Sequence, residues 1–305
     1  MTTLCSGIDE AGYGPLLGPL AVVAVSAEVD EGVRLRQAFA RARTGVKDSK
    51  QIHTAGDIAA IERVALAGIR WLTGTLPLTA GACFALLGER SEQRSDPWMA
   101  DADRLRLPLA ADRVPDWTLT GVRPVALQGV LIHPAAMNQA RARGINRASL
   151  ELGEVSALLA AIPDHLRRET VCDRLGGRRF YGDVLAQTWP EATVTVLGEL
   201  PMRSAYRVEH LGREHELAFC VEGEQLSPLT ALAGCIAKYA RELHMHLFNA
   251  HWGQRIPDLK PTAGYAQDAK RWLGEVGEHQ VAPLRDRLVR SGSEVEAANE
   301  AIDFT

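Results

Sequence analysis

The sequence predicts an α/β protein in which helices flank a mixed sheet. Short runs rich in β-branched residues, above all residues 19–29, are typical of buried strands. Residues 56–68 instead repeat apolar side chains at helical spacing. A long helix is expected to begin at Ser227-Pro228, because a serine cap followed by proline at the first helical position is a strong start signal.

The remaining elements follow in chain order from the same patterns. We expect strands at residues 4–9, 19–29, 71–76, 169–172 and 192–197, and a hairpin at 206–210 and 216–221. We expect helices at residues 56–68, 79–90, 134–142, 147–162, 179–188 and 228–249, with two or three more after Pro261. Residues 88–128 lose periodicity, and we interpret them as an insertion that packs on the core, because Trp98 and Trp117 need burial. The core is expected to span residues 1–250, and residues 251–305 a helical extension packed on it.

Composition and charge exclude several classes of protein. Of the 305 residues, 46% are hydrophobic and 24% are charged, which excludes disordered, collagenous and coiled-coil chains. The formal net charge is −4, so nucleic acid cannot be held by overall charge alone. Five cysteines without a C-x-x-C pair favour free thiols. Since no segment is typical of a signal peptide or a membrane span, we expect a cytoplasmic protein.

Acidic residues stand at or just after the ends of three expected strands. They are Asp9 with Glu10, Asp173, and Glu224. Carboxylates at neighbouring strand ends can converge in space, and hard divalent cations prefer oxygen ligands. Two such ions about 4 Å apart can activate water and stabilise the leaving oxygen in phosphodiester cleavage. Without metal, clustered carboxylates should raise at least one pKa. The alternative is a set of separate, solvated strand-end acids.

A glycine-rich turn at residues 12–18 follows the first acidic strand. It resembles a variant of the dinucleotide-binding fingerprint, which needs a helix after the glycines to hold the pyrophosphate. The residues that follow, 19–25, favour a strand instead. Dinucleotide binding is therefore the weaker alternative.

Several motifs occur together in a fixed order. They are Gly-Ile-Asp-Glu-Ala-Gly-Tyr-Gly-Pro-Leu-Leu-Gly-Pro at residues 7–19, Asp48-Ser49-Lys50, Cys172-Asp173, Gly223-Glu224, Ala233 to Lys238 with Arg241-Glu242, and Gly264-Tyr265. This series resembles the type 2 ribonucleases H, the ribonuclease HII and HIII group. The resemblance implies a ribonuclease H-like mixed five-stranded sheet flanked by helices, here with an insertion and a helical C-terminal extension.

The same resemblance implies an activity. It implies hydrolysis of RNA in RNA/DNA hybrids, or at ribonucleotides embedded in duplex DNA, by two-metal-ion catalysis with Mg²⁺ or Mn²⁺. The residues it assigns to catalysis and metal binding are Asp9, Glu10, Asp173 and Glu224. Those it assigns to substrate binding are Gly12, Tyr13, Gly14, Lys50, Asn146 and Tyr265. The expected partner is nucleic acid rather than a membrane, and the expected state is a monomer.

The chain departs from the family pattern in two places. Tyr13 stands where the family's turn has arginine, which weakens the expected phosphate contact, whereas Gly12 and Gly14 keep close backbone approach possible. Glu224 is typical of the HIII branch, since the HII branch usually has aspartate. The altered turn leaves an alternative: a nuclease-fold protein that binds hybrid or branched nucleic acid with little or no cleavage.

Overall fold

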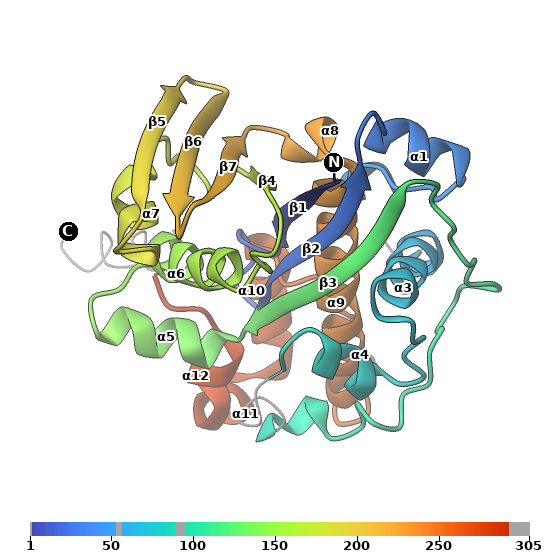
Figure 1. Cartoon of the computed structure of the whole chain (residues 1–305). Helices are drawn as coiled ribbons and strands as arrows, with labels where there is room; N and C mark the ends of the chain where they lie inside the picture. Colours follow the sequence, from blue (N-terminus) through green and yellow to red (C-terminus); the bar gives the residue numbers. More distant parts are fainter. Residues whose placement is uncertain (1, 53–56, 90–94, 293–305) are drawn as a thin grey trace.

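The computed structural model describes residues 2–52, 57–89 and 95–292. These residues form a seven-stranded sheet in the order β3-β2-β1-β4-β7-β6-β5, with helices on both faces (Figure 1). The expected mixed α/β class is confirmed. The sheet has seven strands, more than the five that the family resemblance implied.

The strands pair both parallel and antiparallel. Their bounds are β1 (Thr2–Ala11), β2 (Leu20–Asp30), β3 (Val122–Ile132), β4 (Arg168–Asp173), β5 (Thr193–Glu199), β6 (Arg203–His210) and β7 (Arg213–Cys220). Strand β1 runs antiparallel to β2 and parallel to β4, and β4 runs parallel to β7. Because β1 and β4 are parallel neighbours, their carboxyl ends lie at the same edge of the sheet.

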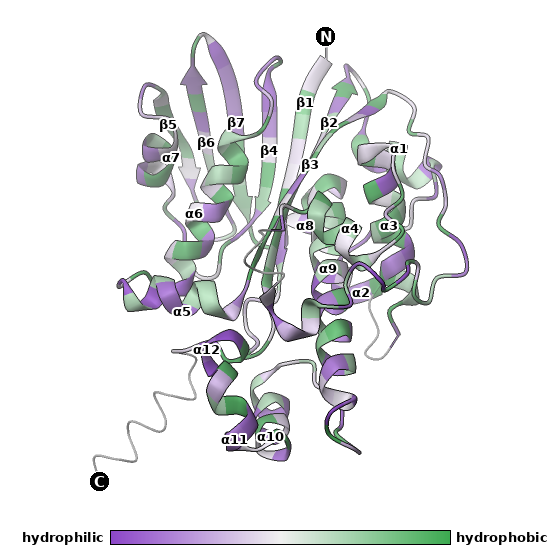
Figure 2. Cartoon of the chain, turned by 90° about the horizontal axis from the view of Figure 1, so that it is seen from below, coloured by the Kyte–Doolittle hydropathy of each residue, from purple (hydrophilic) through white to green (hydrophobic). Residues whose placement is uncertain are grey.

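The helices cover the two faces of the sheet in separate layers. They are α1 (Leu35–Arg41), α2 (Ser49–Ile52), α3 (Ala59–Thr73), α4 (Ala80–Leu86), α5 (Pro134–Ala142), α6 (Arg147–Ala160), α7 (Gly182–Thr188), α8 (Gly223–Leu226), α9 (Pro228–Gly253), α10 (Ala266–Val276), α11 (Glu278–Val281) and α12 (Arg285–Leu288). Figure 2 shows α5, α6 and α7 on one side of the sheet and α1, α3, α4 and α9 on the other. Within the described ranges, none of the helices combines the length and the apolar character needed to cross a bilayer.

Strand β2 separates two hydrophobic cores. Its alternate residues Ala21, Val23 and Val25 pack into the core that contains α3 and α9. Val22 and Ala24 pack into the other core, beneath α6 and α7. This two-residue alternation is the geometry of a strand with both faces covered, and it explains why the segment reads as one continuous apolar run.

Helix α9 confirms the strongest start signal in the sequence. The Ser227 hydroxyl accepts the backbone N–H of Thr230 at 3.3 Å, and Pro228 occupies the first helical position. The helix approaches β1 closely, because a Cβ at Gly7 would lie 2.1 Å from the Thr230 nitrogen. The helix continues to Gly253, four residues beyond its expected end, and the division of the chain at residue 250 stays a prediction.

Two expected elements differ from the structure. Residues 71–76 are not a strand, since Trp71 and Leu72 belong to α3. The helix ends before Gly74, which adopts the left-handed conformation. Residues 88–128 were expected to be irregular, but from Val122 onward they belong to β3. Strand β3 lies at the edge of the sheet, where Pro124 can be accommodated because an edge strand does not need every backbone donor.

The segment before β3 is anchored to the core by a buried carboxylate. Glu62 of α3 accepts the backbone N–H groups of Leu109, Ala110 and Ala111 at 2.7, 2.7 and 2.8 Å. It also accepts the Tyr239 hydroxyl of α9 at 2.8 Å. Trp98 and Trp117 are also buried in the core, so the segment packs on α3 and α9. That it is an insertion stays a prediction. All five cysteines lie within the described ranges and are free, as expected.

Candidate active site

Three carboxyl groups gather where β1 and β4 end. Asp9 and Glu10 lie in the last three residues of β1, and Asp173 is the last residue of β4. One oxygen of each side chain lies within 4.8 Å of the others, and all three residues are half-buried. The sequence therefore brings together residues about 160 positions apart through the parallel pairing of two strands.

A glycine on α9 makes room for Asp9. A Cβ at Gly234 would lie 2.1 Å from the Asp9 Oδ2 atom. The other oxygen, Oδ1, accepts the backbone N–H of Glu10 at 2.8 Å. Any larger residue at position 234 would displace the carboxylate, so this glycine helps to fix where the side chain lies.

Glu224 joins the three acids from α8. The Asp173 Oδ1 atom accepts the backbone N–H of Gly223 at 2.8 Å, which ties the start of α8 to the end of β4. Glu222 before it has φ 55°, in the left-handed region, so the chain bends sharply here. Glu224 is not one of the three residues whose oxygens all lie within 4.8 Å, but it lies close enough to Asp173 for the charge of that residue, after burial, to raise the pKa of Glu224.

The four carboxyl groups have raised pKa values. Burial, followed by the charges of Glu10 and Asp173, raises the pKa of Asp9 well above its ordinary value. Burial and the charge of Asp173 raise the pKa of Glu10 to about 7. Burial also raises the pKa of Asp173 and that of Glu224. The expectation of at least one raised pKa is confirmed, and it follows that a bound cation would relieve the repulsion.

A fifth acid, Glu151 of α6, was missed in the sequence. It is 1% exposed, and neither carboxyl oxygen has a hydrogen-bond partner among the described residues. Burial, followed by the charge of Glu10, raises the pKa of Glu151 to about 8. Its spacing in the sequence could have indicated its burial. Glu151 stands four residues before Val155 and seven before Leu158, so it lies on the same, buried face of the helix as these two residues.

The donor set fits a hard divalent cation. The ligands on offer are carboxylate oxygens, which Mg²⁺ and Mn²⁺ prefer over sulfur or imidazole. The Oε2 atom of Glu10 is buried without a hydrogen-bond partner among the described residues. Such an atom costs free energy unless something binds it, and a cation between Asp9, Glu10 and Asp173 would do so.

The glycine turn lies next to these acids. Gly12 has φ +92°, and a Cβ there would lie 2.5 Å from the Arg241 Cδ atom, so the position requires glycine. A Cβ at Gly14 would meet nothing within 4 Å, so the turn is open at this point. The buried Arg290 holds the turn in place, since its guanidinium donates to the carbonyl oxygens of Gly12 at 2.6 Å and Gly18 at 2.7 Å.

Tyr265 is held beside the turn. The carbonyl oxygen of Gly264 accepts the backbone N–H of Leu16 at 2.7 Å, which joins the start of α10 to the turn. The Arg241 guanidinium lies 5.7 Å from the Tyr265 ring centroid and donates to the Ala263 carbonyl at 2.8 Å. The Tyr265 side chain is half-exposed, at 51%, so one side of the ring is open to a ligand.

Lys50 and Asn146 have different surroundings. Partial burial acts to lower the pKa of Lys50, but nearby carboxylates, among them Asp48, Glu224 and Asp9, raise it overall, so its charge faces the acids. Asn146 caps α6, since its Oδ1 atom accepts the Ser149 backbone N–H at 2.9 Å. It also lines a cavity together with Tyr13.

Part of the chain matches a known protein family, and its structure is similar to several solved structures. Residues 6–64 match the family model described as Ribonuclease HII. The chain is similar to ribonuclease HII in its PCNA complex from Archaeoglobus fulgidus, at 16% identity and a TM-score of 0.49 over 95% of each chain. It is similar to ribonuclease H2 from Pyrococcus horikoshii OT3, at 17% identity and a TM-score of 0.46 over 89% of this chain and 86% of that one. A third similar structure is Bst-RNase HIII in complex with Mn²⁺, at 16% identity and a TM-score of 0.47 over 98% of this chain and 70% of that one.

No curated protein matches the chain in sequence. The family match nevertheless falls on the segment that carries Asp9, Glu10 and the glycine turn. This segment of the chain is similar to ribonuclease HII.

Proposed function

We propose that the chain is a divalent-metal-dependent endonuclease that hydrolyses RNA in RNA/DNA hybrids, or at ribonucleotides embedded in duplex DNA. The observation that carries this proposal is the group formed by Asp9, Glu10 and Asp173, whose oxygens lie within 4.8 Å of one another. Glu224 adds a fourth carboxyl group beside Asp173. Several clustered carboxylates are what two dications need in order to be held together.

Each acidic residue has a role in this proposal. Asp9, Glu10, Asp173 and Glu224 would hold two ions, Mg²⁺ or Mn²⁺. Such ions, when bound, supply Lewis acidity and lower the pKa of water. The chain itself fixes the orientation of Asp9 through the Glu10 backbone N–H and keeps Lys50 close to balance the negative charge.

Recognition of the ribonucleotide is assigned to the turn and to Tyr265. The open position at Gly14 allows the backbone of the turn to approach a 2′-hydroxyl, the group that distinguishes RNA from DNA. The half-exposed Tyr265 lies at the same turn and offers a ring and a hydroxyl to the sugar. We also propose a monomer in the cytoplasm.

The test is a cleavage panel with Mg²⁺ and with Mn²⁺. The substrates are an RNA/DNA hybrid, duplex DNA with one ribonucleotide, double-stranded RNA and plain duplex DNA. We expect cleavage of the first two only. Equal cleavage of plain DNA and ribonucleotide-containing DNA would refute the assignment. Binding of the hybrid without cleavage would favour the alternative, a nuclease-fold protein that binds hybrid or branched nucleic acid.

Two variants of Tyr265 test the sugar contact. Tyr265→Phe removes the hydroxyl and keeps the ring beside Arg241, whereas Tyr265→Ala removes both. We expect both variants to fold, because half of the side chain is exposed, and Tyr265→Ala to lose more activity on the ribonucleotide-containing duplex. Unchanged activity in both variants would exclude Tyr265 from substrate recognition.

A further inference from the structure

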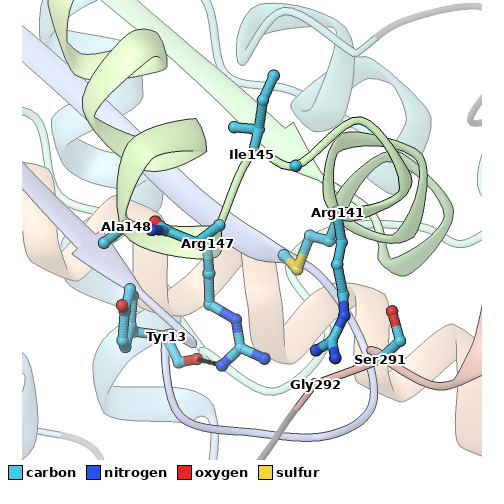
Figure 3. Close-up of a pocket in the computed structure, with 10 residues that line it drawn as sticks. Tyr13, Arg141, Ile145, Arg147, Ala148, Ser291 and Gly292 are labelled. Carbon is cyan, nitrogen blue, oxygen red and sulfur yellow. Dashed lines mark hydrogen bonds between the residues drawn. The ribbon is translucent and has the colours of Figure 1, made fainter.

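A cavity of about 510 Å³ lies beside Tyr13 of the glycine turn (Figure 3). It is enclosed by Tyr13, by the end of α5 and the start of α6, and by Ser291. Among the described residues that line it, the charged side chains are Arg141 and Arg147. The cavity therefore has a positive character in a chain whose formal net charge is −4.

Arg147 is fixed against the turn. Its Nη1 atom donates to the Tyr13 carbonyl oxygen at 2.8 Å, and its guanidinium lies 5.6 Å from the Tyr13 ring centroid. Tyr13 offers no charge to a ligand, but it holds a guanidinium in place. One turn along α6 lies Glu151; burial and the charge of Glu10 raise the pKa of its carboxyl group, and the charge of Arg147 opposes that rise.

Arg141 reaches the cavity from α5. Its guanidinium lies over Gly292, where a Cβ would come within 1.0 Å of the Arg141 Nη1 atom, so any other residue at position 292 would displace it. In Figure 3 the side chains of Arg141 and Arg147 extend in the same direction, into the space between Tyr13 and Ser291. Two guanidinium groups converge there from two different helices.

A third arginine adds positive charge behind the turn. Arg290 is 1% exposed and donates to the carbonyl oxygens of Gly12, Tyr13 and Gly18. These are neutral acceptors, so they leave its charge in place. Burial, followed by the charges of Arg241 and Arg147, lowers the pKa of Arg290 well below its ordinary value. An anion in the cavity would relieve their repulsion.

We propose that this cavity binds a backbone phosphate of the nucleic acid, with Arg141 and Arg147 as its donors. The identity of the ligand rests on the proposed function, whereas the positive cavity does not. Tyr13 is three residues beyond Glu10, so their Cα atoms lie within about 11 Å. A phosphate held here belongs to the same duplex, a few nucleotides from the bond that is cut. Guanidinium groups suit this task because they donate two parallel hydrogen bonds to phosphate oxygens.

The test measures binding of a labelled DNA duplex with one ribonucleotide, in EDTA to prevent cleavage, at several salt concentrations. The variants are Arg141→Gln, Arg147→Gln and the double variant. Arg143→Gln is the matched control, since this exposed arginine is bonded to the Gln139 carbonyl and does not line the cavity. We expect the double variant to bind at least ~10-fold more weakly, with the slope of log K against log salt reduced by about 0.9 for one lost phosphate contact.

Two further variants guard against misfolding. Arg147→Lys keeps the charge and should retain part of the affinity. Arg141→Gln alters an exposed side chain, so it tests the cavity even if Arg147→Gln unfolds. A double variant that binds like Arg143→Gln, in a protein whose wild type cleaves the duplex, overturns this inference alone. A wild-type protein that binds no duplex overturns it together with the proposed function.

Discussion

Two sets of buried carboxylates in this molecule have opposite surroundings. Glu62 receives four hydrogen bonds of 2.7 to 2.8 Å, from three backbone N–H groups and the Tyr239 hydroxyl. At the carboxyl end of β1, Glu10 leaves one oxygen without a partner among the described residues, and Glu151 on α6 leaves both. A carboxylate that holds the fold together is satisfied by donors, whereas one that is to bind a cation must keep its lone pairs free.

The difference also separates stability from function. The satisfied carboxylate of Glu62 joins α3, α9 and the segment before β3. The unsatisfied group raises the pKa values of its own members, so without a cation it destabilises the folded state. Functional sites commonly carry such a cost, and the rest of the fold offsets it. The two sets should therefore respond in opposite ways to removal of a charge.

The largest effect is expected on activity, from Asp9→Asn. The variant loses a metal ligand, so cleavage of the ribonucleotide-containing duplex should fall by about 1,000-fold or more, or about 4 kcal/mol of activation free energy. In EDTA its melting temperature should equal or exceed that of the wild type, because a repelling carboxyl group is gone. A variant that stays active, or one that is strongly destabilised, would place Asp9 with the structural carboxylates.

The opposite pattern is expected for Glu62→Gln. Three backbone N–H donors would face a neutral side chain that cannot accept from all of them, which should cost about 3 kcal/mol of unfolding free energy. Chemical denaturation measures this loss, with the exposed Glu191→Gln as the control. The activity per folded molecule should not change. Equal stability of the two variants would mean that Glu62 anchors nothing.

A smaller effect is expected from pH. The pKa of Glu151 is about 8 in the folded chain, against an ordinary value of 4.5. Between these values the folded state keeps a proton that the unfolded state has lost, so stability falls as pH rises, by at most about 1.4 kcal/mol per pH unit from this group. In EDTA, Glu151→Gln should flatten the fall between pH 5 and 8. An unchanged pH profile would show that Glu151 ionises in contact with water.

Much of the fold could be predicted because local signals agreed with tertiary structure. Some local patterns are compatible with only one type of element. They are the serine cap and proline of α9, the apolar run of β2 and the hairpin around Gly212. The prediction of a strand at 71–76 was wrong because apolar residues such as Trp71 and Leu72 are equally compatible with a buried strand and with a buried helix face. Only Gly74 marks the end of the helix. The start of β3 was missed because Pro124 argues against a strand unless the strand is known to lie at an edge.

The candidate site could be predicted only in part. Strand ends and the order of motifs pointed to Asp9, Glu10, Asp173 and Glu224, and the assignment of these residues to metal binding stays a prediction. Glu151 was missed because a single glutamate on a helix is usually solvated, and its burial depends on packing beneath the sheet. The arginine cavity depends on α5, α6 and Ser291 meeting at one point, which no local pattern encodes.

The most direct test of the central claim is calorimetric titration of Mn²⁺ into the metal-free wild type, Asp9→Asn and Glu62→Gln. If the carboxylates at the ends of β1 and β4 form the metal site, the wild type and folded Glu62→Gln should bind Mn²⁺ with similar affinity, and Asp9→Asn should bind it far more weakly. Binding should also raise the melting temperature, by an amount that corresponds to about 2.7 kcal/mol at 100 times the dissociation constant. Equally tight binding to Asp9→Asn, or no binding to the wild type, would contradict the account.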